Sequence, residues 1–299
     1  MLEVWFFYAL TSVVFFGFTT IVDKLMLETR LSSFSYFVSF VPPAFVFSIC
    51  VLLFFPTNIF SIPYAIAFVA GLISAGGYFL YVVSIRKEEA SRIAALTSLS
   101  PAFVAVLALF LLNEIFPAQS YIGIILMILG SALISYKRNH VKTIIPFSLI
   151  LVLIATNFVY SLDQTLSKIS LDQISFWPFL MMFMFGRFAV AFPGLGIPSV
   201  RRKCFSEIKK LKRNFTLTLA SGSIMWSLAI ILFFYAASLG PITLVSTTSL
   251  ISPLFTLFFA ILITKYLPKA LKEEIDRKTV ALKLVAIVLI LLGTYLIIT

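Results

Sequence analysis

Two apolar stretches of this sequence carry a serine and a proline in similar surroundings. One reads Thr97-Ser98-Leu99-Ser100-Pro101, and the other reads Thr248-Ser249-Leu250-Ile251-Ser252-Pro253. Because proline has no amide hydrogen, a proline inside a helix leaves the carbonyl four residues earlier without its usual donor. In a bilayer that carbonyl needs protein or water as a partner, and matched interruptions in two halves of a chain indicate a transport site near mid-membrane. We predict that five of these residues line a cavity and take part in gating: Thr97, Ser98, Pro101, Ser249 and Pro253.

A charged residue lies about halfway along another apolar segment. Arg187 stands in Met184-Phe185-Gly186-Arg187-Phe188. Since a charge within the bilayer is costly, this side chain is expected to face the interior of a helix bundle. Its partner would be a carboxylate, carbonyl groups or an acidic group of a solute. Asp163 is the candidate for an ion pair or for a coupling role, and the sequence leaves open whether Arg187 is structural or contacts the solute.

Polar and aromatic side chains on other spans would complete a pocket. Asn157 and Tyr160 share one helix face at three-residue spacing, and Tyr78 and Tyr81 share another. Trp226 lies in a third span. Such faces can bind an amphipathic solute, although tyrosine and tryptophan also anchor helices at membrane interfaces. The predicted solute-binding residues are Tyr78, Tyr81, Asn157, Tyr160, Arg187 and Trp226.

The composition determines what kind of elements position these residues. Of 299 residues, 61% are hydrophobic and 12% are charged, whereas a soluble protein has about a quarter charged residues. The apolar runs are continuous and long, which indicates transmembrane helices rather than a barrel. Ten spans are expected, at about 4–22, 34–55, 62–85, 92–112, 118–136, 144–163, 175–193, 215–238, 242–264 and 279–298. The first is expected to be retained, because it lacks a basic start and a small-residue cleavage site.

The ten spans divide into halves of five, residues 1–140 and 141–299. The two proline motifs align, and Gly130 aligns with Gly293. Because five is odd, the second half enters the membrane from the opposite side. We therefore predict an all-α integral membrane protein whose ten transmembrane helices form two inverted five-helix repeats around a central cavity. Chance alignment of apolar sequence is the alternative.

Basic residues predict the orientation. Of the 23 Lys and Arg residues, 21 fall in the loops after odd-numbered spans, which predicts that these loops face the cytoplasm and that both termini face outward in the cell membrane. The net charge of +11 is spread over short loops beside lipid headgroups, so a nucleic-acid partner is not expected. Apolar residues at near-helical spacing between 204 and 215 alternate with basic ones. They predict a short helix on the anionic inner leaflet or, alternatively, a regulatory partner site.

Features of catalysis are missing from the sequence. It has no glycine-rich phosphate loop, paired-histidine zinc motif or nucleophile elbow. The two cysteines, Cys50 and Cys204, are isolated, and His140 stands in a basic loop. We expect no cofactor, no metal site and no enzymatic activity.

The stretch from Ala94 to Ala108, with Asn113-Glu114 and the glycine-bearing span after it, resembles the drug/metabolite transporter superfamily, specifically its EamA-domain family. The stretch from Gly240 to Pro253 resembles the second copy of that domain. The resemblance implies ten helices around a cavity that carries amino acids or other small metabolites. The sequence departs from the family pattern at Thr264-Lys265-Tyr266, where a glutamate like Glu114 is expected, and in the predicted outward termini.

The leading hypothesis is a secondary transporter that moves small amphipathic metabolites by alternating access, as a monomer or a homodimer. The alternative is a non-transporting assembly or sensor subunit with the same fold, which would have a dry, apolar interior. An intramembrane enzyme would need converging carboxylates, histidines or a metal site, and the sequence offers none.

Overall fold

The computed structural model describes residues 3–29, 31–39, 41–55, 60–85, 99–134, 147–266 and 277–298, and every regular element within these ranges is helical. Thr97, Ser98 and His140 lie outside the described residues.

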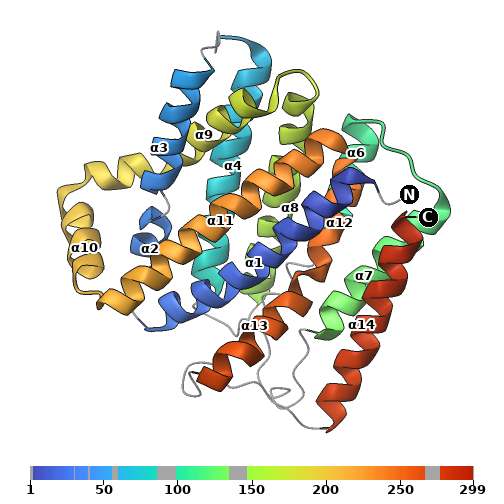
Figure 1. Cartoon of the computed structure of the whole chain (residues 1–299). Helices are drawn as coiled ribbons and strands as arrows, with labels where there is room; N and C mark the ends of the chain where they lie inside the picture. The colour runs from blue at the N-terminus through green and yellow to red at the C-terminus, as the bar shows by residue number, and fades with distance from the viewer. Residues whose placement is uncertain are drawn as a thin grey trace.

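The helices follow one another along the chain as Figure 1 shows. The first half contains α1 (Val4–Thr29), α2 (Ser33–Ser39), α3 (Val41–Phe54), α4 (Ile62–Ile85), α6 (Ser100–Leu111) and α7 (Ala118–Ile134). The second half contains α8 (Phe147–Leu171), α9 (Phe176–Gly196), α10 (Pro198–Lys209), α11 (Arg213–Leu239), α12 (Ile242–Thr248), the 3-10 helix η2 (Ser249–Ile251), α13 (Ser252–Tyr266) and α14 (Arg277–Ile298).

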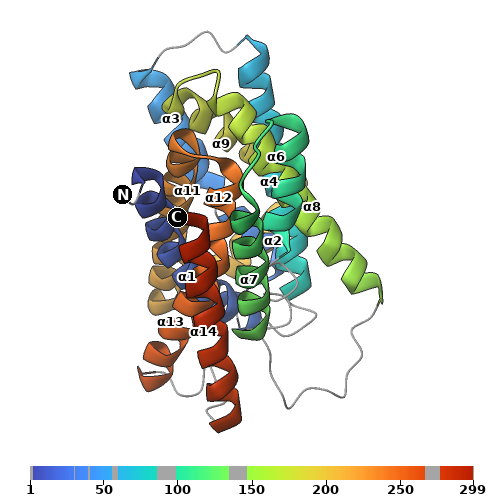
Figure 2. The same ribbon diagram turned by 90° about the vertical axis from the view of Figure 1, so that its right-hand side faces the viewer.

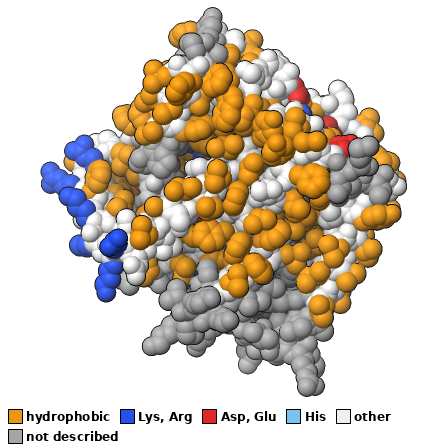
Figure 3. All heavy atoms as spheres, in the orientation of Figure 1, with side chains coloured by type: hydrophobic (Ala, Val, Ile, Leu, Met, Phe, Trp, Pro, Cys, Tyr) orange, Lys and Arg blue, Asp and Glu red, His pale blue; other side chains and the backbone are white. Residues whose placement is uncertain are grey.

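Several helices have the length and composition of membrane spans. Val4–Leu27, Ile62–Ser84, Phe176–Gly196 and Arg213–Leu239 are long and apolar enough to cross a membrane. Shorter apolar helical stretches are Phe45–Phe54, Ser100–Leu111, Ala118–Leu133, Ile242–Thr256 and Leu284–Ile297. Figure 3 shows hydrophobic side chains over most of the visible face, with Lys and Arg gathered at the α10 end. Polar side chains such as Ser12 and Asn157 are fully buried instead. The described helices agree with the predicted all-helical membrane protein, and the count of ten spans stays a prediction.

Two expected helix ends were placed too early. The first span was expected to end at residue 22, but α1 continues to Thr29 and so includes Asp23. The sixth was expected to end at 163, but α8 continues to Leu171. In both places apolar residues follow the charged residue and the helix continues. The carboxylates of Asp23 and Asp163 are buried in protein rather than exposed to lipid.

Both prolines lie in the first turn of a described helix, and the helix of Pro253 directly follows the 3-10 helix η2, which continues from α12. Pro101 lies in the first turn of α6, and Pro253 is the second residue of α13. In a first turn the amide hydrogen that proline lacks would have no helical acceptor, so proline fits there. The expectation that Pro253 frees the carbonyl of Ser249 is wrong, because the amide of Ser252 donates to that carbonyl.

Helices that are distant in sequence pack in related pairs (Figures 1 and 2). Helix α1 packs along α11, and α4 packs along α8. Helix α3 contacts α9, and α7 lies along α14. The order of helices along the two halves makes α1 correspond to α8 and α4 correspond to α11. Under this correspondence, the pair of α1 and α11 is equivalent to the pair of α8 and α4. In the pair of α3 and α9, and in the pair of α7 and α14, the two partners correspond to each other.

Helices α4 and α9 approach each other most closely at two glycines. A Cβ on Gly71 would lie 2.0 Å from the carbonyl oxygen of Phe183, and a Cβ on Gly186 would lie 2.1 Å from that of Phe68. Only glycine allows two helix backbones to come this near. The contact places Arg187, the next residue on α9, against the middle of α4.

Candidate solute-binding site

Arg187 lies at the centre of a polar chain that joins three helices. Its side chain projects from α9 and is 7% exposed, and Nη1 donates a hydrogen bond of 2.6 Å to Ser74 Oγ on α4. Asp163 on α8 is hydrogen-bonded to the same serine, and its charge interacts with that of Arg187. Ser74 thus accepts from the guanidinium and donates to the carboxylate, so the two opposite charges are connected through one hydroxyl.

Aromatic rings surround the guanidinium. The Cζ atom of Arg187 lies 4.4 Å from the ring centroid of Trp226, 5.7 Å from that of Tyr78 and 6.0 Å from that of Phe183. A guanidinium within about 6 Å of a ring centroid is attracted by the negative face of the ring. Three helices, α4, α9 and α11, therefore contribute aromatic walls to one buried cation.

Tyr81 and Tyr160 lie at the edge of this cluster. The rings of Tyr78 and Tyr81 are stacked, with centroids 6.1 Å apart. The ring of Tyr160 lies against Gly77 of α4. Asn157 is fully buried one turn earlier on α8, and its Nδ2 donates to the carbonyl of Leu153 in its own helix at 2.8 Å. The structure brings Tyr78, Tyr160, Arg187 and Trp226 together, and Asn157 lies beside them.

Sequence reasoning missed Asp23 and Tyr36. The Asp23 carboxylate on α1 accepts a hydrogen bond from the hydroxyl of Tyr36 on α2 and a longer one, 3.5 Å, from that of Tyr78. Asp23 is 5% exposed and Tyr36 is fully buried. The available signal was the apolar residues that continue after Asp23, Leu25, Met26 and Leu27, which place the carboxylate within a helix rather than in a loop.

Two of the predicted gating residues, Pro101 and Ser249, lie near buried oxygens that have no partner among the described residues. Pro101 follows Ser100 on α6, and Ser249 Oγ donates to the carbonyl of Ser246 on α12 at 2.6 Å. Among the described residues, several buried side-chain oxygens on the contacting helices α6, α8 and α12 have no hydrogen-bond partner. They belong to Ser100, Gln164, Ser167, Thr243 and Ser246. Buried polar atoms in a native protein normally find a partner, so these are available to water or to a solute.

A groove lies at the α10 end, beside the helices that carry Arg187 and Trp226. It has a volume of about 690 Å³ and lies between α11 on one side and α2, α3 and α10 on the other. Met184, three residues before Arg187, lines it, and so do Ser223 and Ser227 on either side of Trp226. Most of the other lining side chains are apolar, namely Val38, Phe47, Leu195, Cys204, Phe205, Ile208, Leu219, Ala220, Ile224, Leu228 and Ile231.

The short helix expected after the seventh span is α10. Its apolar face turns largely toward the protein, since Cys204 is 3% exposed and Ile208 packs on the core, while Phe205 is 57% exposed. Glu207 on the same helix accepts hydrogen bonds from the amide and hydroxyl of Ser32, at 3.1 and 2.8 Å, just before α2. Helix α10 therefore forms one wall of the groove.

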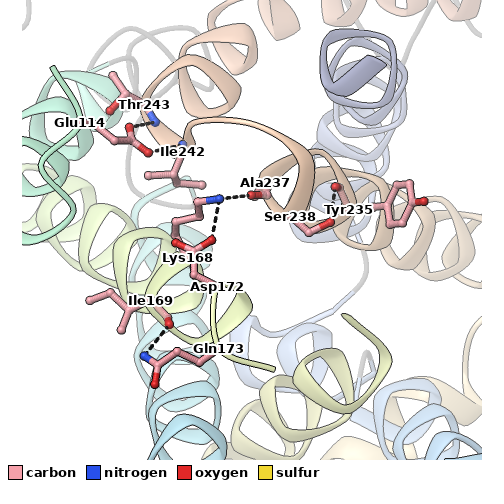
Figure 4. Close-up of polar contacts among 10 residues, drawn as sticks. All are labelled: Glu114, Lys168, Ile169, Asp172, Gln173, Tyr235, Ala237, Ser238, Ile242 and Thr243. Atoms are coloured by element: carbon pink, nitrogen blue, oxygen red, sulfur yellow. Dashed lines mark hydrogen bonds and ion pairs between the residues drawn. The ribbon is translucent and has the colours of Figure 1, made fainter. Parts of the chain in front are cut away.

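A polar network ties the helices together at the opposite end of α11 (Figure 4). The carboxylate of Glu114, beyond the end of α6, accepts the amides of Ile242 and Thr243 at 2.9 and 3.1 Å, which are free donors in the first turn of α12. Lys168 on α8 donates to the carbonyl of Ala237 on α11 and forms an ion pair with Asp172, both at 2.9 Å. We call these contacts the Glu114–Lys168 network.

The structure contains no evident alternative chemistry in the part of the chain that it describes. No group of three or more His, Cys, Asp and Glu side chains there could hold a metal ion. The two described carboxylates near Arg187 are separated among different helices and are engaged by hydroxyl groups.

Comparisons with known proteins agree with this architecture. Twenty chains of solved structures match, and one of them, titled "Crystal structure of protein", has a TM-score of 0.74 and 12% identity over 99% of this chain and 96% of its own. At that identity the likeness concerns the fold alone. No curated protein matches the chain. Residues 3–136 match the EamA-like transporter family, the domain of the drug/metabolite transporter superfamily. The family match therefore extends over the residues of the first five expected spans.

Proposed function

We propose that this protein is a secondary carrier for small amphipathic solutes that bear an acidic group, amino acids among them. The observation that carries the proposal is a buried guanidinium with aromatic walls, held by helices that also line a groove. Arg187 uses one of its nitrogens on Ser74, and a guanidinium has five N–H donors, so it can also hold a carboxylate.

The walls of the groove favour a solute with an apolar part. Trp226 and Tyr78 offer ring faces beside the guanidinium, and the groove side chains are mostly apolar. A binding pocket with apolar walls and a few polar anchors is typical of a small-molecule site. An amino acid with an aromatic or aliphatic side chain has this combination of groups.

The two ends of the protein support alternating access. The groove separates α11 from α2 and α3 at the α10 end, while the corresponding pair of the other half, α4 and α9, is closed at Gly71 and Gly186. The Glu114–Lys168 network closes the far end of α11. A carrier built from repeats of residues 1–140 and 141–299 would reverse this asymmetry by rocking one repeat against the other.

The charge pattern supports a cytoplasmic location for the α10 end of the groove. Arg201, Arg202 and Lys203 are exposed on α10 and would contact an anionic inner leaflet in the cell membrane. This orientation places both termini outside. Since the whole site is formed within one chain, a monomer is sufficient for binding, and a homodimer would contain two sites.

Counterflow of labelled amino acids in proteoliposomes tests the proposal. Wild type should exchange at least one of them, radiolabelled phenylalanine being the first probe. Arg187→Gln should slow exchange by at least tenfold, and Arg187→Lys should retain part of it because the charge stays but the planar fork is lost. Arg213→Gln, an exposed change at the start of α11, is the control.

The thermal stability of each variant separates loss of binding from loss of folding. Exchange by Arg187→Gln at the wild-type rate would contradict the proposed site. Absence of exchange for every amino acid by a stable wild-type protein, with no rise of its melting temperature on their addition, would favour the non-transporting subunit.

A further inference from the structure

Asp23 is a buried carboxylate without a basic partner. It is 5% exposed, and in the described part of the chain no Lys, Arg or His side chain forms an ion pair with it. Its hydrogen bonds come from two neutral phenols, Tyr36 on α2 and Tyr78 on α4. Arg187 lies over the ring of Tyr78 and donates to Ser74 instead.

The titratable and charged groups around Asp23 are few. Tyr36 faces it from α2, and Tyr78 and Tyr81 face it from α4. Tyr160 faces it from α8, and α11 brings only the uncharged Trp226 close to Tyr78. Arg187 and Asp163 offset each other through Ser74. Together, Asp23, Asp163 and Arg187 therefore carry one net negative charge when Asp23 is ionised and none when it is protonated.

We propose that Asp23 binds and releases a proton during the transport cycle, so that the carrier is coupled to a proton gradient. The inference rests on the carrier function proposed above. A proton from water adds to a carboxylate oxygen of Asp23 and gives the neutral acid, and its release to water on the other side restores the carboxylate. Both tyrosines keep their own protons throughout.

The geometry explains why proton and solute would move together. A buried charge without an opposite charge is costly when the surrounding helices close over it. The protein should therefore change from open at one end to open at the other more readily when Asp23 is protonated. Tyr78 contacts both the proton-binding carboxylate and the arginine, since its hydroxyl donates to Asp23 and its ring lies beside Arg187. A solute that displaces this ring alters the hydrogen bond to Asp23, and the reverse is also true.

Transport measurements in two modes test the coupling. In counterflow without a pH gradient, Asp23→Asn should still exchange radiolabelled phenylalanine at a measurable rate, because asparagine resembles the neutral acid. With an imposed pH gradient, wild type should accumulate the label several-fold above the level without a gradient, and Asp23→Asn should show no such stimulation. Glu3→Gln, which changes an exposed carboxylate, should behave as wild type in both modes.

Failures of the two proposals are distinguishable. Counterflow by wild type without any effect of the gradient overturns proton coupling but leaves the carrier. Accumulation by Asp23→Asn that still follows the gradient also overturns it. If wild type exchanges no labelled amino acid, the proposed carrier function fails.

An infrared titration tests proton binding without any solute. The purified protein in lipid bilayers should show a carbonyl band of a protonated carboxyl group that is absent from Asp23→Asn, persists in Asp163→Asn and moves in Tyr36→Phe, which removes one donor. Absence from wild type, at every pH, of any band that depends on Asp23 would overturn the inference.

Discussion

Each charged side chain in the centre of this protein has a different kind of partner. Arg187 has a hydroxyl and ring faces, Asp163 shares that hydroxyl, and Asp23 has only phenols. A single buried ion pair would satisfy its own charges and exclude a ligand. Here Arg187 and Asp163 are joined through the hydroxyl of Ser74, and Asp23 is joined to Tyr36 and Tyr78.

At the surface, a glutamate shows a simpler dependence on charge. Burial alone would raise the pKa of Glu207, but hydrogen bonds from Ser35 and Ser32 and the charge of Lys203 outweigh it and lower that pKa. The folded pKa is below the unfolded value, so the stabilisation is present above the unfolded value of about 4.3 and is lost as the pH falls through the folded pKa.

Glu207→Gln should therefore lower the melting temperature near neutral pH by an amount that corresponds to about 1 kcal/mol or less, since the group is largely solvated. The melting temperatures of wild type and variant should converge at acid pH, once the pH has fallen through the lowered pKa of folded Glu207 and the wild-type side chain is protonated as well. An equal difference at both pH values would mean that the carboxylate charge contributes nothing to holding α10 against the segment before α2.

At the scale of helices, close packing and open packing occur at corresponding places. Helix α4 meets α9 through Gly71 and Gly186, whereas α11 leaves the groove against α2 and α3. The glycine contact keeps Arg187 against α4, and in the proposed carrier the groove would give the solute access. Helix α4 thus packs closely on α9 because of Gly71, whereas α11 borders an open groove.

Gly71→Ala should strongly destabilise the protein, because its Cβ would lie 2.0 Å from the carbonyl oxygen of Phe183 and the two backbones would have to separate. The loss should reach several kcal/mol, as for other overpacked buried contacts. Gly76→Ala is the matched control on the same helix, because nothing lies within 4 Å of its added Cβ. It should leave the melting temperature unchanged or raise it, since alanine is the better helix former.

Thermal unfolding in detergent measures both variants. Equal stability of Gly71→Ala and Gly76→Ala would contradict the close approach of α4 and α9.

For the molecule as a whole, the sequence predicted the helices better than their partners. Continuous apolar runs give spans directly, and α4 was predicted at its observed bounds. The pairs α1 with α11 and α4 with α9 could not be predicted, because one sequence carries no information on which apolar faces meet. The central arginine was identifiable by its charge. Asp23 was missed because it adjoins Lys24, and a charged pair is typical of a span's end.

The asymmetry between the two ends predicts a reciprocal response. If the protein rocks as a unit, weakening the Glu114–Lys168 network should close the groove at the α10 end. Glu114→Ala removes two hydrogen bonds from a carboxylate to the first turn of α12. Such bonds contribute about 1.5–3 kcal/mol each, so the ratio of the two states should change by at least tenfold.

The groove residue Ser227 reports this change. In a background with Cys50 and Cys204 replaced by serine, Ser227→Cys should react with a membrane-impermeant maleimide added on the α10 side. Addition of Glu114→Ala should slow that reaction several-fold, while Gln173→Ala, an exposed change at the same end of α8, should not alter it. A faster or unchanged reaction with Glu114→Ala would mean that the two ends move independently, because a rigid rocking motion cannot open one end without narrowing the other.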